Sequence, residues 1–134
     1  MKNIAILAHD DLKPLMVDFL IERRDWIPDV SFIATGRTAE FIEKAGIAVK
    51  HLSPGETGGY RQIIDKIYAK EIDIVIFFRD ADVTDHHDDI SDLMYACVKS
   101  NIPFAANFVS AELLILGLMR KETASKYRKL RKGN

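Results

Sequence analysis

The sequence has little of several residue types, and each shortage excludes a class of protein. Cys97 is the only cysteine in 134 residues, so no disulfide forms within the chain and an oxidising compartment is not indicated. Lysine and arginine number 19 against 20 aspartates and glutamates, a balance that disfavours a dedicated nucleic-acid-binding protein. The hydrophobic runs are shorter than the ~18 residues of a membrane helix, and the N-terminus lacks the pattern of a signal peptide. We therefore expect a cytoplasmic protein that binds neither nucleic acid nor membrane.

Five short apolar runs alternate along the chain with five segments whose apolar residues recur at helical spacing. The runs are residues 4–8, 31–34, 47–52, 72–78 and 104–106, and the helical segments are residues 12–24, 38–45, 60–69, 89–99 and 110–119. Gly46 is predicted to end the second helix, and Ser110 to cap the fifth. Strands that alternate with helices predict βαβ units, and therefore an α/β fold with a parallel sheet.

The C-terminal end of the chain is strongly basic. Residues 120–134 contain seven lysines or arginines against one glutamate. We expect one domain at residues 1–119, with this basic C-terminal tail packed on the same domain or fraying from it. A solvated helix is the simplest interpretation of the tail. The alternatives are a contact that closes the pocket or binds phosphate and, more weakly, nucleic-acid binding.

Polar side chains gather directly after the predicted strands. In parallel α/β sheets the carboxyl ends of the strands meet at one edge, and ligands bind there. The side chains after the five strands are, in order, His9, Asp10, Asp11 and Lys13; Thr35, Arg37 and Thr38; Ser53, Glu56 and Thr57; Arg79, Asp80, Asp82, Asp85, His86, His87, Asp88 and Asp89; and Asn107 and Ser110. The sequence therefore predicts a polar pocket at this edge of the sheet.

Two of these loops have the composition of an anion site. Residues 35–38 lie between a strand and a helix, where hydroxyls and helix N-terminal N–H groups can donate to phosphate. Residues 53–59 contain three glycines, which allow close backbone approach, and Lys13 can add a positive charge. For each loop alone a turn or a helix cap is the simpler interpretation, but together they predict phosphate binding. The sequence has neither GxxxxGK[ST] nor GxGxxG, so a nucleoside triphosphatase or dinucleotide enzyme is not indicated.

The loop at residues 80–89 holds five carboxylates and two histidines. We expect no metal site here, because the adjacent His86 and His87 can scarcely both face one ion and the sequence has no HExxH motif. Crowded carboxylates shift one another's pKa and can serve as general acid or base. A solvated acidic loop whose aspartates cap the next helix is the alternative, and for Asp88 alone it is the simpler one.

Several short motifs occur in order between residues 2 and 116. They are Ile6-Leu7-Ala8-His9-Asp10 with Lys13; Ala34-Thr35-Gly36 with Thr38; Ser53 and Gly58-Gly59 with Gln62; Phe77-Phe78-Arg79-Asp80; His86 with Asp89; and Asn101-Ile102-Pro103 with Asn107. Together they resemble the methylglyoxal synthase family. The resemblance implies a three-layer α/β/α fold with a five-stranded parallel sheet in the order 3-2-1-4-5, assembled as a homohexamer. It further implies a lyase that converts dihydroxyacetone phosphate to methylglyoxal and inorganic phosphate without metal or organic cofactor.

The resemblance also assigns roles to individual residues. His86 is expected to polarise the substrate carbonyl, and Asp10, Asp80 and Asp89 fall on the other catalytic positions. The expected substrate-binding residues are His9, Lys13, Thr35, Gly36, Arg37, Thr38, Ser53, Gly55, Gly58, Gly59 and Tyr60. Arg37 stands where the family usually has a threonine, which replaces a hydroxyl donor by a cation.

Tyr60 is the most important departure from the family pattern. The residue after the Gly-Gly pair is usually an aspartate that removes the carbon-bound proton, and a phenol with a pKa near ~10 is a poor base at neutral pH. Losing a general base costs roughly 10²- to 10⁴-fold in rate. Three outcomes are open: Glu56, Asp10 or Asp89 acts as the base, activity is slow, or the domain only binds an anion.

Functions outside enzyme catalysis are the remaining alternatives. The regulatory domain at the end of carbamoyl-phosphate synthetase has a similar fold and phosphate site and binds effectors without chemistry; Tyr60 favours this hypothesis. A phosphorelay receiver needs an aspartate at the end of the third strand, where this chain has His51-Leu52-Ser53. The third alternative is a structural subunit of a larger assembly.

Overall fold

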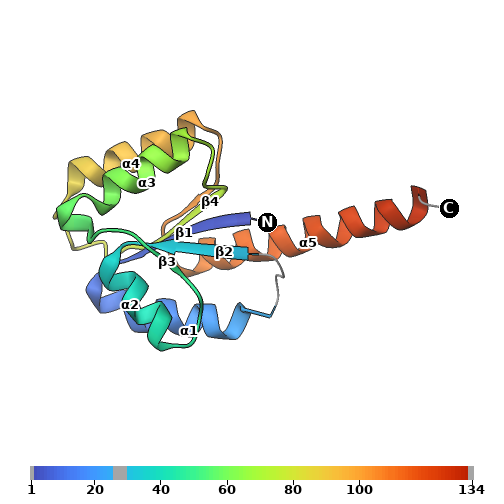
Figure 1. The fold of residues 1–134 in the computed structure, drawn as a ribbon, viewed down its shortest axis with the longest axis horizontal. Coiled ribbons are helices and arrows are strands. Elements are labelled where there is room, and N and C mark those ends of the chain that lie inside the picture. Colours follow the sequence, from blue (N-terminus) through green and yellow to red (C-terminus); the bar gives the residue numbers. More distant parts are fainter. Residues whose placement is uncertain (1, 26–29, 133–134) are drawn as a thin grey trace.

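The computed structural model describes residues 2–25 and 30–132, with side chains at all of these except Glu56 and residues 121–132. The elements are β1 (Lys2–Ala8), α1 (Lys13–Arg23), β2 (Val30–Ala34), α2 (Gly36–Lys44), β3 (Lys50–His51), α3 (Gly59–Tyr68), β4 (Ile74–Phe78), α4 (His87–Lys99), β5 (Phe104–Ala105) and α5 (Phe108–Lys132). Two short 3₁₀ turns, η1 (Asp10–Leu12) and η2 (Gly55–Thr57), precede α1 and α3. Figure 1 shows the resulting arrangement.

All strand pairs of the sheet are parallel, and their order is β3-β2-β1-β4-β5. This confirms the predicted fold class and strand order. Because β1 lies at the centre, the loops after β1, β2 and β4 converge at the carboxyl edge of the sheet. The order reverses beside β1, where open α/β sheets hold their ligands.

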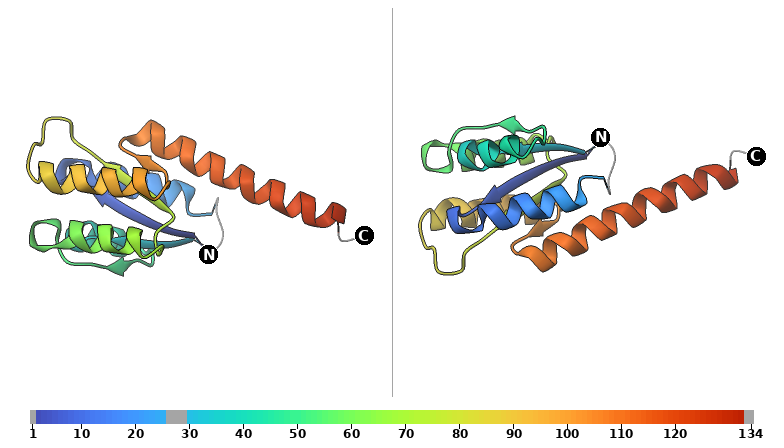
Figure 2. Two further views of the ribbon diagram at one scale, coloured as in Figure 1. Left: turned by 90° about the horizontal axis from the view of Figure 1, so that it is seen from above. Right: turned by 90° about the horizontal axis from the view of Figure 1, so that it is seen from below.

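Alternation of side chains along the central strands builds two cores. Ile4, Ile6 and Ala8 of β1 face one side, where helices α1, α2 and α5 pack. Ala5 and Leu7 face the other side, where α3 and α4 pack. Figures 1 and 2 show α3 and α4 lying side by side over one face of the sheet. The nearly continuous hydrophobicity of β4 follows from this arrangement, because all five of its residues are buried.

The third strand and the fifth helix differ from the sequence prediction. The predicted strand at residues 47–52 is reduced to Lys50–His51, which pairs with β2 at the sheet edge. The fifth helix begins two residues earlier than predicted. Asn107 caps it instead of Ser110, because the Ser110 backbone N–H donates to Asn107 Oδ1 at 2.8 Å. The second helix does end just before Gly46, as predicted.

Helix α5 is much longer than the predicted segment and continues to Lys132. Its C-terminal half extends beyond the layers of the domain, past the amino-terminal edge of the sheet (Figures 1 and 2). The basic tail thus leads away from the loops at the carboxyl edge of its own chain, which disfavours a role in closing that edge. The side chains of the tail after Arg120 lie outside the described part of the chain. Among the helices described, none combines the length and the apolar character that a membrane span requires.

Cys97 is an internal reporter of the α3–α4 side of the core. Its side chain is 1% exposed, and burial raises the pKa of the thiol to about 11. The ordinary pKa of a cysteine thiol, which applies in the unfolded chain, is 9.0, so the folded state holds this proton more tightly. The free energy of unfolding therefore falls as the pH rises from 9.0 to about 11. We expect an alkylating reagent at about pH 8 to label Cys97 slowly in the native protein and rapidly in urea. Mass spectrometry that detected equal labelling rates would contradict this.

Candidate functional site

A cavity of about 410 Å³ lies at the carboxyl edge of the sheet. Its walls come from the segments after β1, β2 and β4 and from the start of α3, which are far apart in the sequence. The lining residues are Ala8, His9, Asp10, Asp11, Lys13, Thr35, Arg37, Thr38, Gly55, Tyr60, Asp80, Val83, Asp85 and His86. The predicted polar pocket is therefore present at the predicted edge.

Lys13 is the buried cation of this cavity. Its Nζ donates to the backbone oxygen of Ala8 at 2.7 Å and to Asp10 Oδ1 at 2.9 Å, and the residue is only 4% exposed. An ammonium group has three N–H donors, so a third donor remains for a ligand oxygen. Pro14 follows Lys13 in the first turn of α1, where a missing N–H costs no helical hydrogen bond.

Asp10 lies between two cations, with Oδ1 on Lys13 and Oδ2 at 3.3 Å from Arg37 Nη1. The hydrogen bond from Lys13 holds the pKa of Asp10 below its usual value, and the charges of Lys13 and Arg37 lower it further. A carboxylate with a lowered pKa is a weaker base, so Asp10 is poorly suited to remove a carbon-bound proton.

The start of α2 forms the neutral part of an anion site. Thr35 and Thr38 are 7% and 2% exposed, and both line the cavity. The Gly36 N–H donates to the backbone oxygen of Ser53, and the Ala39 N–H donates to that of Thr35. The N–H groups at the start of α2 belong to its first turn, where the helix itself provides no acceptors. They can donate, together with the two hydroxyls, to an oxyanion beside Lys13.

Gly59 and Ser53 hold the wall behind this anion site. A Cβ on Gly59 would lie 2.2 Å from the Ser53 oxygen and 2.8 Å from Thr35 Cγ2, so only glycine fits. Gln62 fixes Ser53 from α3: its Oε1 accepts from the Ser53 N–H at 2.8 Å, and its Nε2 donates to Ser53 Oγ at 3.2 Å. Ser53 and Gly59 therefore support the site through packing and do not line the cavity themselves.

His9 has a defined tautomer. Its Nδ1 accepts a hydrogen bond from the Asp80 backbone N–H at 2.7 Å, which requires an unprotonated Nδ1 and leaves the proton of the neutral ring on Nε2. Burial lowers the pKa of His9, and the positive charge of Arg79 lowers it further. His9 is thus a neutral Nε2–H donor in the cavity at neutral pH.

Tyr60 and His86 form the opposite wall. Tyr60 is 9% exposed, its ring stacks on Phe77 with centroids 6.1 Å apart, and it lies 5.7 Å from the His86 ring. The Tyr60 ring also requires Gly55, because a Cβ there would lie 2.7 Å from Tyr60 Cε2. His86 precedes α4 with a left-handed backbone, φ 60°, and lines the cavity, whereas His87, the first residue of the helix, does not; both histidines are exposed.

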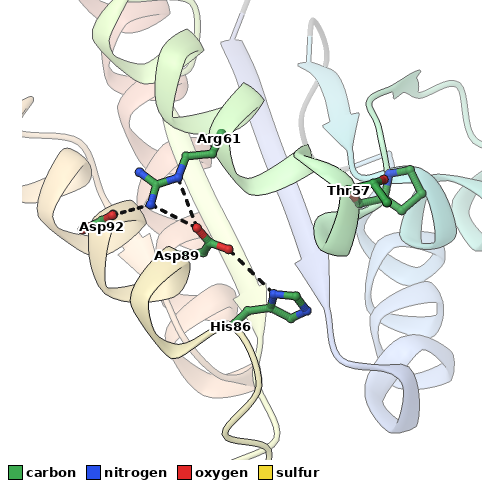
Figure 3. Close-up of polar contacts among 6 residues, drawn as sticks. Thr57, Arg61, His86, Asp89 and Asp92 are labelled. Atoms are coloured by element: carbon green, nitrogen blue, oxygen red, sulfur yellow. Dashed lines mark hydrogen bonds and ion pairs between the residues drawn. The ribbon is translucent and has the colours of Figure 1, made fainter.

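Asp89 is held on the far side of His86. Its Oδ1 accepts from Arg61 Nε at 3.1 Å, and its Oδ2 lies 3.7 Å from His86 Nδ1 (Figure 3). Asp89 does not line the cavity. Across the residues that the structure describes, no three side chains of the His, Cys, Asp and Glu types are placed to hold a metal ion.

The structure brings together ten of the fifteen predicted site residues as cavity lining. The predicted residues that do not line the cavity are Gly36, Ser53, Gly58, Gly59 and Asp89. Reasoning from the sequence missed Val83 and left Asp11 and Asp85 out of the site, although both aspartates had been placed at the correct edge. Glu56, one of the surrogate bases considered, lies outside the described side chains.

Comparison with known proteins assigns the chain to a family. The family model described as an MGS-like domain matches residues 17–106. Methylglyoxal synthase of Thermoanaerobacterium thermosaccharolyticum is 42% identical over 118 residues, which is 87% of this chain and 88% of that protein. The chain belongs to the methylglyoxal synthase family.

Other members agree in sequence and in structure. Methylglyoxal synthase of Caldicellulosiruptor saccharolyticus is 42% identical over 120 residues, covering 88% of this chain and 85% of that protein. The crystal structure of methylglyoxal synthase from Elizabethkingia anophelis superposes with a TM-score of 0.79 at 34% identity, over 85% of this chain and 76% of that one. The family membership predicted from the motifs is confirmed.

Proposed function

We propose that this member of the methylglyoxal synthase family is a lyase that converts dihydroxyacetone phosphate to methylglyoxal and inorganic phosphate. The observation that carries the proposal is the cavity itself, in which a buried lysine and a helix start face two histidines and several carboxylates. A base removes a proton from the carbon beside the carbonyl, and an enediolate forms. The bond between carbon and the phosphate oxygen then breaks, phosphate leaves, and the remaining enol becomes methylglyoxal.

The anion half of the cavity holds the phosphate in this proposal. Lys13 contributes charge, and Thr35, Thr38 and the first-turn N–H groups of α2 contribute donors that are already oriented. Arg37 lies at the rim, where its side chain is 62% exposed and paired with Asp10. A donor set that exists before the substrate binds supports both the substrate phosphate and the departing phosphate ion.

The histidines supply hydrogen bonds to oxygens that gain negative charge. His86 donates to the carbonyl oxygen in the proposed mechanism, because a donor aimed at the developing enediolate stabilises the transition state more than the substrate. His9 offers its Nε2–H from the other side of the cavity, next to Lys13, and can assist the departing phosphate oxygen.

Asp80 is our candidate for the base. Asp10 is engaged by two cations and Asp89 by Arg61, whereas Asp80 lines the cavity with Oδ1 accepting from the Asp82 N–H at 2.9 Å. Tyr60 occupies the position where the family resemblance implies an aspartate. The base must therefore come from another segment of the cavity wall if turnover occurs.

An anion-binding regulatory domain is the second candidate function, and the burial of Tyr60 at the expected base position favours it. Such a domain retains the phosphate site and lacks turnover. The proposal as a whole also includes a cytoplasmic homohexamer that uses no cofactor, as the resemblance implies.

The test of the lyase is stoichiometric product formation from dihydroxyacetone phosphate. We expect equal amounts of inorganic phosphate and methylglyoxal, released at a rate above that of the substrate in buffer. Lys13→Met provides the control for phosphate binding, measured as the loss of inhibition by inorganic phosphate. Calorimetric binding of phosphate without any product would select the regulatory domain instead.

A further inference from the structure

Arg61 connects the two helices that bring Tyr60 and His86 to the cavity. It belongs to α3, directly after Tyr60, and its guanidinium reaches two aspartates of α4. Nε and Nη2 each lie 3.1 Å from Asp89 Oδ1, and Nη2 lies 2.6 Å from Asp92 Oδ2 (Figure 3). Asp89 and Asp92 are three residues apart, so they share one face of α4. A single cation therefore cross-links the helices just behind the cavity wall.

The two oxygens of the Asp89 carboxylate face different partners, Arg61 and His86. Oδ1 faces the guanidinium, and Oδ2 lies 3.7 Å from His86 Nδ1. A carboxylate whose first oxygen is fixed by a cation on one helix presents its second oxygen in a set direction. The His86 ring turns its Nδ1 edge toward that oxygen, and its other nitrogen points away from Asp89 (Figure 3). The 3.7 Å separation can shorten in a substrate complex, because catalytic hydrogen bonds commonly tighten on binding.

We propose that Arg61 is a positioning residue of this site. Together with Asp92 it fixes the Asp89 carboxylate, and through Asp89 it determines which edge of the His86 imidazole faces the cavity. The consequence for turnover rests on the proposed lyase function, whereas the consequence for the His86 ring does not. Asp89 thereby acts as an orienting carboxylate and not as a substitute base.

The exposure of these three side chains indicates that the contact between Arg61 and the two aspartates orients His86 more than it stabilises the fold. The Arg61, Asp89 and Asp92 side chains are 54%, 30% and 52% exposed, and ion pairs with this exposure contribute little to the free energy of unfolding. The hydrogen bond to Asp92 raises the pKa of Arg61, so the guanidinium is charged at neutral pH. The His86 backbone is fixed at the start of α4, and its ring contacts Asp89 and Tyr60, which orient the side chain.

The experiment compares Arg61→Gln with Lys66→Gln. Both replacements remove one positive charge from α3, but Lys66 pairs with Glu71 at 4.0 Å and has no part in the α4 contact. Long-range ¹H–¹⁵N spectra of the histidine side chains report the tautomer and hydrogen bonding of each ring, and His86→Gln assigns the His86 signals. We expect Arg61→Gln to shift the His86 ring signals while those of His9 stay in place, and Lys66→Gln to leave both unchanged.

Turnover provides the second measurement where the lyase is active. We expect Arg61→Gln to lower kcat about 10- to 100-fold with little change in KM, because a misdirected donor affects the transition state. Arg61→Lys keeps the charge and should restore part of kcat. Unchanged His86 signals in Arg61→Gln would overturn the inference, even if the melting temperature of the variant is lower than that of the natural protein. Shifted His86 signals in a protein without turnover would support Arg61 as positioning residue and reject the lyase.

Discussion

Replacing Tyr60 by aspartate is expected to increase the rate of methylglyoxal formation by up to roughly 10²- to 10⁴-fold, the contribution of a well-positioned general base. Tyr60 lines the cavity beside His86, so a carboxylate there faces the same space as the proposed carbonyl donor. The matched control is Tyr60→Asn, which has the same size and no basic group. Tyr60→Asn should leave the rate near that of the natural protein, and an equal gain in both variants would show that cavity size, not a base, limits turnover.

The same substitution is expected to lower stability. Tyr60 is 9% exposed and packs on Phe77 and Gly55, so a smaller side chain leaves a void that costs about 2–4 kcal/mol of unfolding free energy. Assays therefore belong well below the melting temperature of the variant, measured in parallel. Asp80→Asn in both backgrounds then tests the proposed base. It should abolish turnover in the natural protein and spare most of it in Tyr60→Asp; loss in both would assign Asp80 another role.

Replacing His86 by glutamine is expected to lower kcat roughly 10²- to 10³-fold, the range observed when a donor to a developing oxyanion is removed. KM should change much less, because in the proposed mechanism Lys13 and α2 hold the phosphate on the other side of the cavity. His87→Gln is the matched control, since His87 is the adjacent histidine and does not line the cavity. Equal kcat values for His86→Gln and the natural protein would remove His86 from the mechanism.

The backbone at His86 calls for a second variant. Its φ of 60° is uncommon for residues other than glycine, and asparagine adopts it more readily than glutamine does. His86→Asn therefore removes the imidazole with less backbone strain. Both variants should lose activity to a similar degree, and activity retained in His86→Asn alone would attribute the glutamine effect to strain at the start of α4.

The strands and helices were largely predictable because their signals are local. β4 is apolar throughout because both faces of a parallel strand are covered, and the helices show the spacing of one buried face. The edge strand was the exception. Residues 47–52 have the composition of a strand, yet only Lys50–His51 pair, because an edge position offers a partner on one side alone.

The candidate site was predictable as a region but not residue by residue. Parallel topology brings the ends of β1, β2 and β4 together, so His9, Lys13, Thr35, Thr38 and His86 could be placed at one edge from their position after strands. Asp89 was assigned to catalysis from the family resemblance, and in the structure it lies behind His86 in contact with Arg61. The contact between Arg61 and Asp89 could not be predicted from the sequence, because the two residues are 28 positions apart.

The sequence alone determined the parallel α/β fold, the edge that holds the cavity and, through its motifs, the methylglyoxal synthase family. These follow from patterns in short segments and from the fixed handedness of βαβ units. Tertiary structure alone decided that His86 and not His87 faces the cavity and that Tyr60 is buried against Gly55. It also decided that the Asp10 carboxylate forms ion pairs with two cations, Lys13 and Arg37. Such outcomes depend on how helices dock on the sheet, where shifts of a few ångströms select the neighbours of each side chain.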